Sequence, residues 1–162
     1  KNLGKSRYRM EAGYVSRDLP SALLFTGEGS YHVNYPVISK NTFQTMAPYE
    51  FISDQYLNVF LSHNFETLLF KTQKFQPLLT LHQNLGWGKL NQHQVFDKNG
   101  FTTKEKVFLE SGLQIDNIIK MNFKNLGYLG MGGAVFYRYG DYALPESSDN
   151  VVYKFTLNFT IK

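Results

Sequence analysis

The chain of 162 residues contains no cysteine and one tryptophan, and no part of it is a long hydrophobic run. The absence of cysteine excludes disulfide bonds, thiol catalysis and zinc sites built on thiolates. A helix that spans a bilayer needs roughly 20 consecutive apolar residues, so helical membrane spans are excluded as well. A membrane β-barrel passes this test, because its strands alternate apolar and polar side chains and give a weak hydropathy signal.

Basic residues outnumber acidic ones but do not cluster. The 17 Lys and Arg against 13 Asp and Glu give a formal charge of +4, and no run of five like charges occurs. Nucleic-acid binding relies on clustered Lys and Arg, so we do not expect it. What the chain has in excess is aromatic residues, with 14 Phe and 11 Tyr in an aromatic share of 16%. Both residue types are favoured in strands, and the composition therefore favours an all-β fold.

The clearest pattern lies in the last segment, 150–162, where apolar and polar residues alternate without a break. Successive side chains of a strand point to opposite faces, so this period gives one apolar face and one polar face. A terminal strand with an aromatic outer face and a polar inner face is typical of outer-membrane β-barrels. The side chains that we expect to face lipid are Tyr153, Phe155, Leu157, Phe159 and Ile161.

Five further segments show the same two-residue period: 5–16, 50–65, 77–90, 107–119 and 125–139. Soluble strands average about 5 to 6 residues, whereas a tilted strand that crosses a bilayer needs roughly 9 to 11. The segment lengths favour an antiparallel transmembrane β-barrel, with 1–162 as part of one barrel domain. The polar residues expected to line its lumen are Arg9, Glu11, His82, Glu110, Asp116, Arg138 and Lys154.

The connections predict which end of the barrel faces outwards. Bacterial barrels have short periplasmic turns and longer extracellular loops. With the C-terminus in the periplasm, 17–49, 91–106 and 140–149 lie outside, and 120–124 is a tight inner turn.

The segment 17–49 is the exceptional connection. It exceeds the roughly 12 to 15 residues beyond which connections without structure become uncommon. Its apolar content favours a loop that folds back into the barrel mouth or lumen, with a short extra hairpin within 22–35. The expected anchors of this loop are Phe43, Met46 and Tyr49.

No group of residues predicts a catalytic or metal site. Ser62 and His63 are adjacent in a strand, so their side chains face opposite sides and cannot act together as nucleophile and base. The four histidines lack the spacing of metal ligands. His82, Glu110 and Asp116 are candidates for an acid and base pair, but mutual pairing in a polar interior is the simpler interpretation. We therefore expect a non-enzymatic protein without a cofactor.

Five stretches of the chain resemble one known family: 18–25, 43–46, 50–56, 61–65 and 109–118. This is an uncharacterised bacterial outer-membrane family with an N-terminal carboxypeptidase-regulatory-like domain and a large barrel. The resemblance implies that the chain is the C-terminal part of a longer protein, whose barrel is similar in plan to the BamA and TamA superfamily. It also implies that the long loop folds into the lumen, although a Val-Arg-Gly-Tyr tip is not present in it.

Six strands do not close a barrel, since known single-chain bacterial barrels begin at eight. Either the hairpin within 22–35 supplies two strands, or further strands precede Lys1. We predict an integral protein of the bacterial outer membrane with a structural, transport or assembly role. Its expected partners are lipid, the remaining barrel strands, and other outer-membrane or periplasmic proteins. The alternatives are a soluble lipocalin-like barrel with its apolar faces inward, and an outer-membrane enzyme that acts on lipid.

Overall fold

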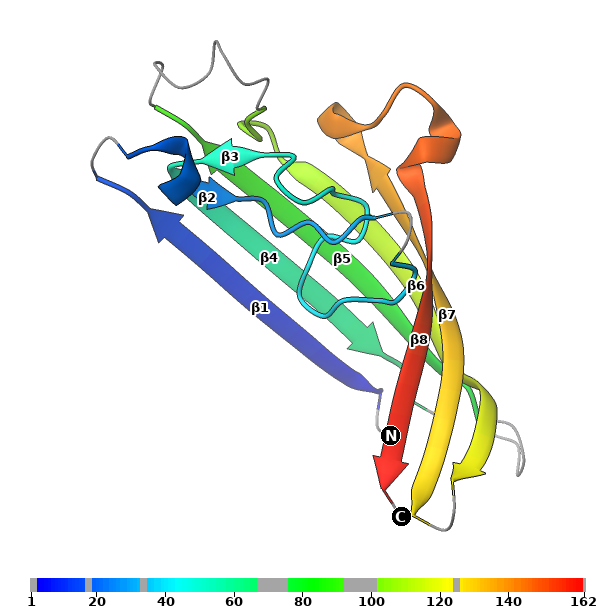
Figure 1. Ribbon diagram of the computed structural model, residues 1–162. Helices are drawn as coiled ribbons and strands as arrows, with labels where there is room; N and C mark the ends of the chain where they lie inside the picture. The colour runs from blue at the N-terminus through cyan, green and yellow to red at the C-terminus, as the bar shows by residue number, and fades with distance from the viewer. Residues whose placement is uncertain are drawn as a thin grey trace.

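Six long strands form one antiparallel sheet, in the order β1, β4, β5, β6, β7, β8 (Figure 1). The computed structural model describes residues 3–16, 19–32, 35–66, 76–91, 102–123 and 126–161. In sheet order, the strands are Lys5–Tyr14, Gln55–Asn64, Leu78–Lys89, Phe108–Phe123, Gly127–Tyr139 and Val151–Ile161. The prediction of an all-β fold with six long strands is confirmed.

The sheet is open within the described ranges. In the sheet, β1 pairs with β4 alone and β8 pairs with β7 alone, so these two strands are its edges. Figure 1 shows the sheet twisting along its width, with the chain between β2 and β3 lying across one of its faces. The described strands therefore do not close into a barrel.

The segment that precedes β4 contributes a second, two-stranded sheet. In it, β2 (Phe25–Thr26) pairs antiparallel with β3 (Ile52–Ser53). The hairpin expected within 22–35 is therefore wrong. The reason is a small apolar cluster in which Leu24 packs with Ile52 and Leu90, all nearly fully buried. Burial of these side chains holds β2 against β3, far along the chain, and not against its near neighbours.

The remaining short elements are single turns of 3-10 helix. None of the helices in the described ranges has the length and hydropathy of a membrane span. Two of the turns connect β7 to β8 at one end of the sheet (Figure 1). Their bounds are Ser21–Leu23 for η1, Gly140–Tyr142 for η3 and Ser147–Asn150 for η4.

β6 runs further than the sequence pattern predicts. A tight turn was expected at 120–124, but the strand continues to Phe123. Its register with β7 shifts between Ile115 and Ile119, and Asn117 has a φ of 57°. These features define a β-bulge, in which residues without a partner interrupt the ladder. Because the bulge also interrupts the alternation of apolar and polar residues, the pattern in the sequence stops too early.

The apolar core lies between the sheet and the long segment before β4. Phe43 and Met46 of the segment are 0% exposed, and they share a cluster with Phe51, Phe60 and Phe108. The Phe43 ring lies 4.9 Å from the Phe60 ring and 5.1 Å from the Phe108 ring, centroid to centroid. Aromatic pairs at this separation add to the gain from burial. The segment is thus packed onto the sheet by its own aromatic side chains.

The expectation that Tyr49 anchors the segment is wrong. Tyr49 is 68% exposed and has a φ of 61°, in the left-handed region. It lies in a turn closed by a hydrogen bond of 3.3 Å from the Glu50 nitrogen to the Ala47 carbonyl oxygen. This turn directs Tyr49 away from the sheet, and Phe51, which is 2% exposed, enters the core after it.

Candidate functional site

The strands assign their side chains to two faces of opposite character. Directly opposed residues in neighbouring strands point to the same side of a sheet. One row of opposed residues runs from Arg9 through Phe60, Asn84 and Glu110 to Arg138. The long segment packs on this side, which we call the covered face. The register places all seven polar residues predicted for the lumen on the covered face: Arg9, Glu11, His82, Glu110, Asp116, Arg138 and Lys154.

The opposite side, which we call the open face, is apolar and nearly free of charge. A row across it runs from Met10 through Val59, Leu85 and Leu109 to Tyr139. Within the bounds of the six described strands, this face carries no Asp, Glu or Arg. Its basic residues are His63 and Lys89, each near the end of its strand. The five residues expected to face lipid in β8 lie on the open face and are 54 to 79% exposed.

Polar side chains on the open face bond to one another. The Ser111 hydroxyl donates to Gln83 Oε1 at 2.7 Å, and the Tyr139 hydroxyl donates to the same oxygen at 3.2 Å. Gln83 Nε2 in turn donates to the Glu110 carbonyl oxygen at 3.2 Å. A polar group that is hydrogen-bonded within the protein can be withdrawn from water at much lower cost.

His63 is the second polar point of this face. Its Nδ1 lies 2.8 Å from the Ser6 hydroxyl, and its Nε2 lies 3.2 Å from the Leu3 carbonyl oxygen. Ser62, its neighbour in sequence, lies on the covered face opposite His82. Ser6 is a partner that sequence reasoning missed, since only the pairing of β1 with β4 brings it to His63. Both ring nitrogens of His63 have a hydrogen-bond partner, and one of these partners is a backbone carbonyl. The arrangement therefore satisfies the histidine structurally.

On the covered face, Glu110 holds the long segment to the sheet. Its side chain is 0% exposed and accepts four hydrogen bonds. The backbone nitrogens of Gln44 and Thr45 donate at 3.1 and 2.6 Å, and the Thr45 hydroxyl donates at 2.7 Å. Asn84 Nδ2 of β5 donates at 2.7 Å. Hydrogen bonds to a carboxylate are stronger than neutral ones, so Glu110 is the main polar attachment of the segment.

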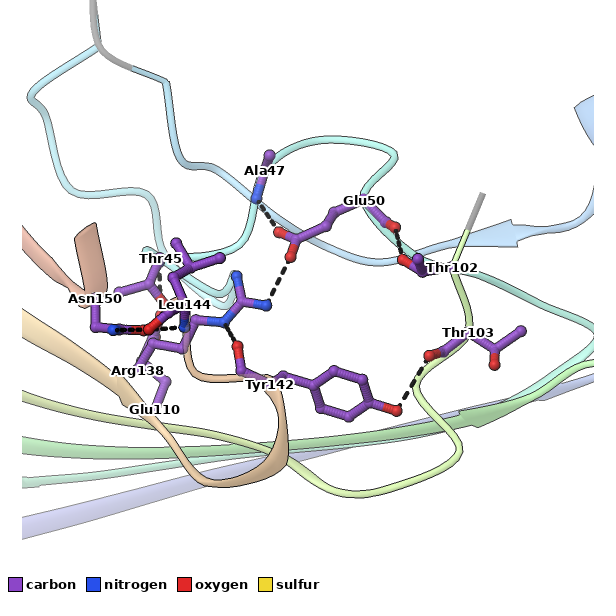
Figure 2. A network of polar contacts seen from close by, with 10 residues as sticks. All are labelled: Thr45, Ala47, Glu50, Thr102, Thr103, Glu110, Arg138, Tyr142, Leu144 and Asn150. Atoms are coloured by element: carbon purple, nitrogen blue, oxygen red, sulfur yellow. Dashed lines mark hydrogen bonds and ion pairs between the residues drawn. The ribbon is translucent and has the colours of Figure 1, made fainter. Parts of the chain in front are cut away.

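Arg138 joins the same segment to the C-terminal end of β7 (Figure 2). Its Nη2 lies 2.7 Å from Glu50 Oε1, and its Nε donates to the Tyr142 carbonyl oxygen. The guanidinium carbon is 4.8 Å from the centroid of the Phe108 ring, which is cation–π geometry. The Arg138 side chain is 5% exposed and the Glu50 side chain 22%, so this ion pair is partly shielded from water.

The loops near Arg138 are also tied to one another. The Tyr142 hydroxyl donates to the Thr103 carbonyl oxygen at 3.1 Å, and the Thr102 hydroxyl donates to the Glu50 carbonyl oxygen at 2.7 Å (Figure 2). The chain before β4, the chain before β6 and the connection after β7 therefore meet at one end of the sheet. Together they cover the residues of the core at that end.

Two lysines extend onto the covered face. Lys104, which is 1% exposed, donates to Asn58 Oδ1 at 3.0 Å and lies 5.2 Å from the centroid of the Phe43 ring. Burial lowers the pKa of Lys104 to about 8, against the opposing effect of Glu28. Lys154 of β8 donates to the Tyr35 carbonyl oxygen at 2.9 Å. Lys104 was not expected at the site, because it follows no two-residue pattern.

The residues considered as an acid and base pair are only partly brought together. His82 Nε2 lies 2.8 Å from Gln114 Oε1, and Gln114 Nε2 donates to Asp116 Oδ2 at 2.8 Å. Glu110 belongs to the separate group around Thr45. His82 and Asp116 are thus linked through an amide that cannot carry a proton between them at neutral pH, and the arrangement is a polar network.

Glu28, which lies outside the strands, has a carboxyl group whose pKa is well above its ordinary value. Burial is the largest effect that raises the pKa of Glu28 to about 7, and the neighbouring Glu11 is the second. Arg9 and Lys104 act in the opposite direction. Because the folded pKa lies above the ordinary value of 4.5, the protonated Glu28 contributes to the free energy of unfolding. This contribution is fully present below pH 4.5 and is lost as the pH rises through 7.

This titration predicts a pH-dependent stability. Glu28→Gln removes the titrating group, so wild type should lose unfolding free energy relative to this variant between about pH 5 and pH 7. Urea unfolding at the two pH values measures the difference, and Glu146→Gln, at an exposed site, is the matched control. Lys104 titrates above this window and does not obscure it. An equal difference between wild type and Glu28→Gln at both pH values would contradict the prediction.

Across the part of the chain that the structure describes, no group of three or more His, Asp or Glu is placed to hold a metal ion. The sequence matches no protein-family model, no curated protein and no solved structure. The function must therefore be argued from the two faces of the sheet and from the segment that covers one of them.

Proposed function

We propose that the chain is part of an outer-membrane β-barrel, with the open face in lipid and the covered face turned to a lumen that the described residues 19–32 and 35–50 fill. The observation that carries this proposal is the near absence of charge on the open face across six strands. In transmembrane barrels, lipid-facing and lumen-facing residues alternate, and Arg or Lys at the bilayer midplane costs about 2–4 kcal/mol. A soluble sheet has no comparable reason to exclude charge from an exposed face.

A continuous groove supports the same orientation. It crosses the open face over five strands and has a volume of about 840 Å³. Its apolar lining includes Leu61, Leu81, Leu113 and Val135. Large exposed apolar surfaces mark sites of interaction with proteins, ligands or membranes, and under this proposal acyl chains cover the groove. The soluble lipocalin-like alternative requires this apolar face to be enclosed, whereas Tyr153 of β8 is 76% exposed.

The proposal also accounts for the two edges. β1 and β8 each have one neighbour in the sheet, and unpaired backbone groups within lipid cost several kcal/mol each. Further strands must join these edges, which agrees with the larger barrel implied by the family resemblance. The role of the whole protein is then structural, in transport or in assembly, with the bound segment as a plug.

The tryptophan provides a direct test. Trp87 lies on the open face, opposite Leu57, and its Nε1 donates to the Glu105 carbonyl oxygen at 2.9 Å. In bilayers whose acyl chains carry bromine, we expect the Trp87 fluorescence to be strongly quenched. Iodide in the aqueous phase should quench it weakly.

Two adjacent positions in β8 give the matched control. In a Trp87→Phe background, Leu157→Trp places the probe on the open face and Asn158→Trp places it on the covered face. Brominated chains should quench the first several-fold more than the second. Equal quenching of the two, or a chain that stays dispersed in plain buffer without detergent, would contradict the membrane orientation.

A further inference from the structure

The edge of β8 is occupied at its middle by part of the long segment. Ile38 donates its backbone N–H to the Phe155 carbonyl oxygen at 3.0 Å, and the Phe155 N–H donates to the Pro36 carbonyl oxygen. Val37 thereby forms a parallel bridge with Phe155. Every pair within the six-stranded sheet is antiparallel, so this contact does not continue the pattern of the sheet.

The contact occupies only a small part of the edge. In an antiparallel strand, alternate residues direct both backbone groups to the same neighbour. Since Phe155 directs both of its groups away from β7, Tyr153 and Leu157 point theirs to the same free edge. Such a row of donors and acceptors is a template for another strand. Residues 35–38 interrupt this row at its centre.

These residues are held less firmly than the buried residues 43–46 of the same segment. Tyr35 is 68% exposed and Val37 is 52% exposed, whereas Phe43 is 0% exposed. Besides the bridge, Lys154 donates to the Tyr35 carbonyl oxygen at 2.9 Å, and the Tyr35 N–H donates to the His32 carbonyl oxygen of the same segment at 3.0 Å. Between the two parts, Asn41 has a φ of 58°, a conformation that reverses the chain. The segment therefore has an anchored part and a lightly attached part.

We propose that residues 35–38 form a removable strap on β8, which excludes any added strand until it leaves. The backbone N–H and C=O of Phe155 are both bonded to the strap, so an antiparallel strand cannot bond to the same groups while the strap is in place. Pro36 has no N–H, so the strap is itself a poor template for further pairing. The inference concerns the sheet edge and holds whether or not the open face lies in lipid. Where a barrel closes at β8, it requires the strap to move.

Paired cysteines test whether the strap is seated. The chain has no cysteine of its own, so each double variant has only the introduced pair. Val37→Cys with Phe155→Cys joins directly opposed residues. Neighbouring strands lie about 4.7–4.9 Å apart, within the Cα separation of about 4.4–6.8 Å that a disulfide accepts. Val37→Cys with Tyr153→Cys or with Leu157→Cys is the control, displaced by two residues, or roughly 6.6 Å, along β8. The first pair should oxidise readily and the controls poorly; equal oxidation of all three would overturn the proposal.

Association of the chain in detergent micelles tests whether the strap excludes strands. Ile38→Pro removes the N–H that bonds Phe155, and Ile38→Ala keeps it. We expect the dimer fraction, measured by light scattering, to be several-fold higher for Ile38→Pro than for Ile38→Ala. Oxidation of the Val37→Cys, Phe155→Cys variant should lower the dimer fraction below that of its reduced form. If Ile38→Pro does not fold, this second comparison decides alone, and a dimer fraction unchanged by oxidation would overturn the proposal.

Discussion

Replacement of Glu110 by Ala is expected to lower the free energy of unfolding by about 3 to 5 kcal/mol. The carboxylate is fully buried and accepts hydrogen bonds from Gln44, Thr45 and Asn84. Each buried donor left without a partner costs about 1–3 kcal/mol. The loss of several acceptor contacts at once places this substitution well above the usual effect of a single change.

The measurement is urea unfolding of the variant in the detergent used for wild type. Glu146→Ala, at an exposed carboxylate between η3 and η4, should change stability by no more than about 0.5 kcal/mol. Glu110→Gln should fall between the two, because it keeps one carbonyl oxygen but turns an amide group towards the donors. Limited proteolysis should cut Glu110→Ala faster within 39–47. If Glu110→Ala were as stable as Glu146→Ala, Glu110 would not be the attachment of the segment.

The strands could be predicted because their information is local. In β8, the alternation of Tyr153, Phe155 and Leu157 with polar residues defines a strand and both of its faces without knowledge of any neighbour. The same period is strong in β1 and β5. Once the strands pair, alternation in each must agree with alternation in the next. Charged side chains such as Arg9 and Arg138 then lie on the same face, although their strands are far apart in the order of the sheet.

The contacts of the long segment could not be predicted, since they join residues far apart in the chain. Thr45 bonds to Glu110 across 65 positions, and Lys154 bonds to Tyr35 across 119. No local period signals such a pair. Lys104 was missed for the same reason, and the bulge at Asn117 was missed because it erases the pattern that reveals a strand. Burial between two surfaces selects these partners, and a single sequence does not display either surface.

An arginine in place of Leu157 is expected to destabilise the protein in bilayers by about 2–4 kcal/mol if the site is near the midplane. Leu157 lies on the open face in β8, opposite Met131 of β7, and is 59% exposed. In water, a substitution at a site this exposed normally changes stability by no more than about 0.5 kcal/mol. The expected effect therefore comes from the solvent around the open face and not from packing within the protein.

Position along the strand and choice of face separate this cause from a general effect of added charge. Ile161→Arg lies on the same face at the end of β8, where the cost should fall to about 0–1 kcal/mol. Asn158→Arg adds the same charge on the covered face and should be tolerated better than Leu157→Arg. Reversible unfolding from lipid bilayers measures all three variants. A cost for Leu157→Arg no larger than that for Ile161→Arg would mean that the open face meets water, and the barrel orientation would then have to be abandoned.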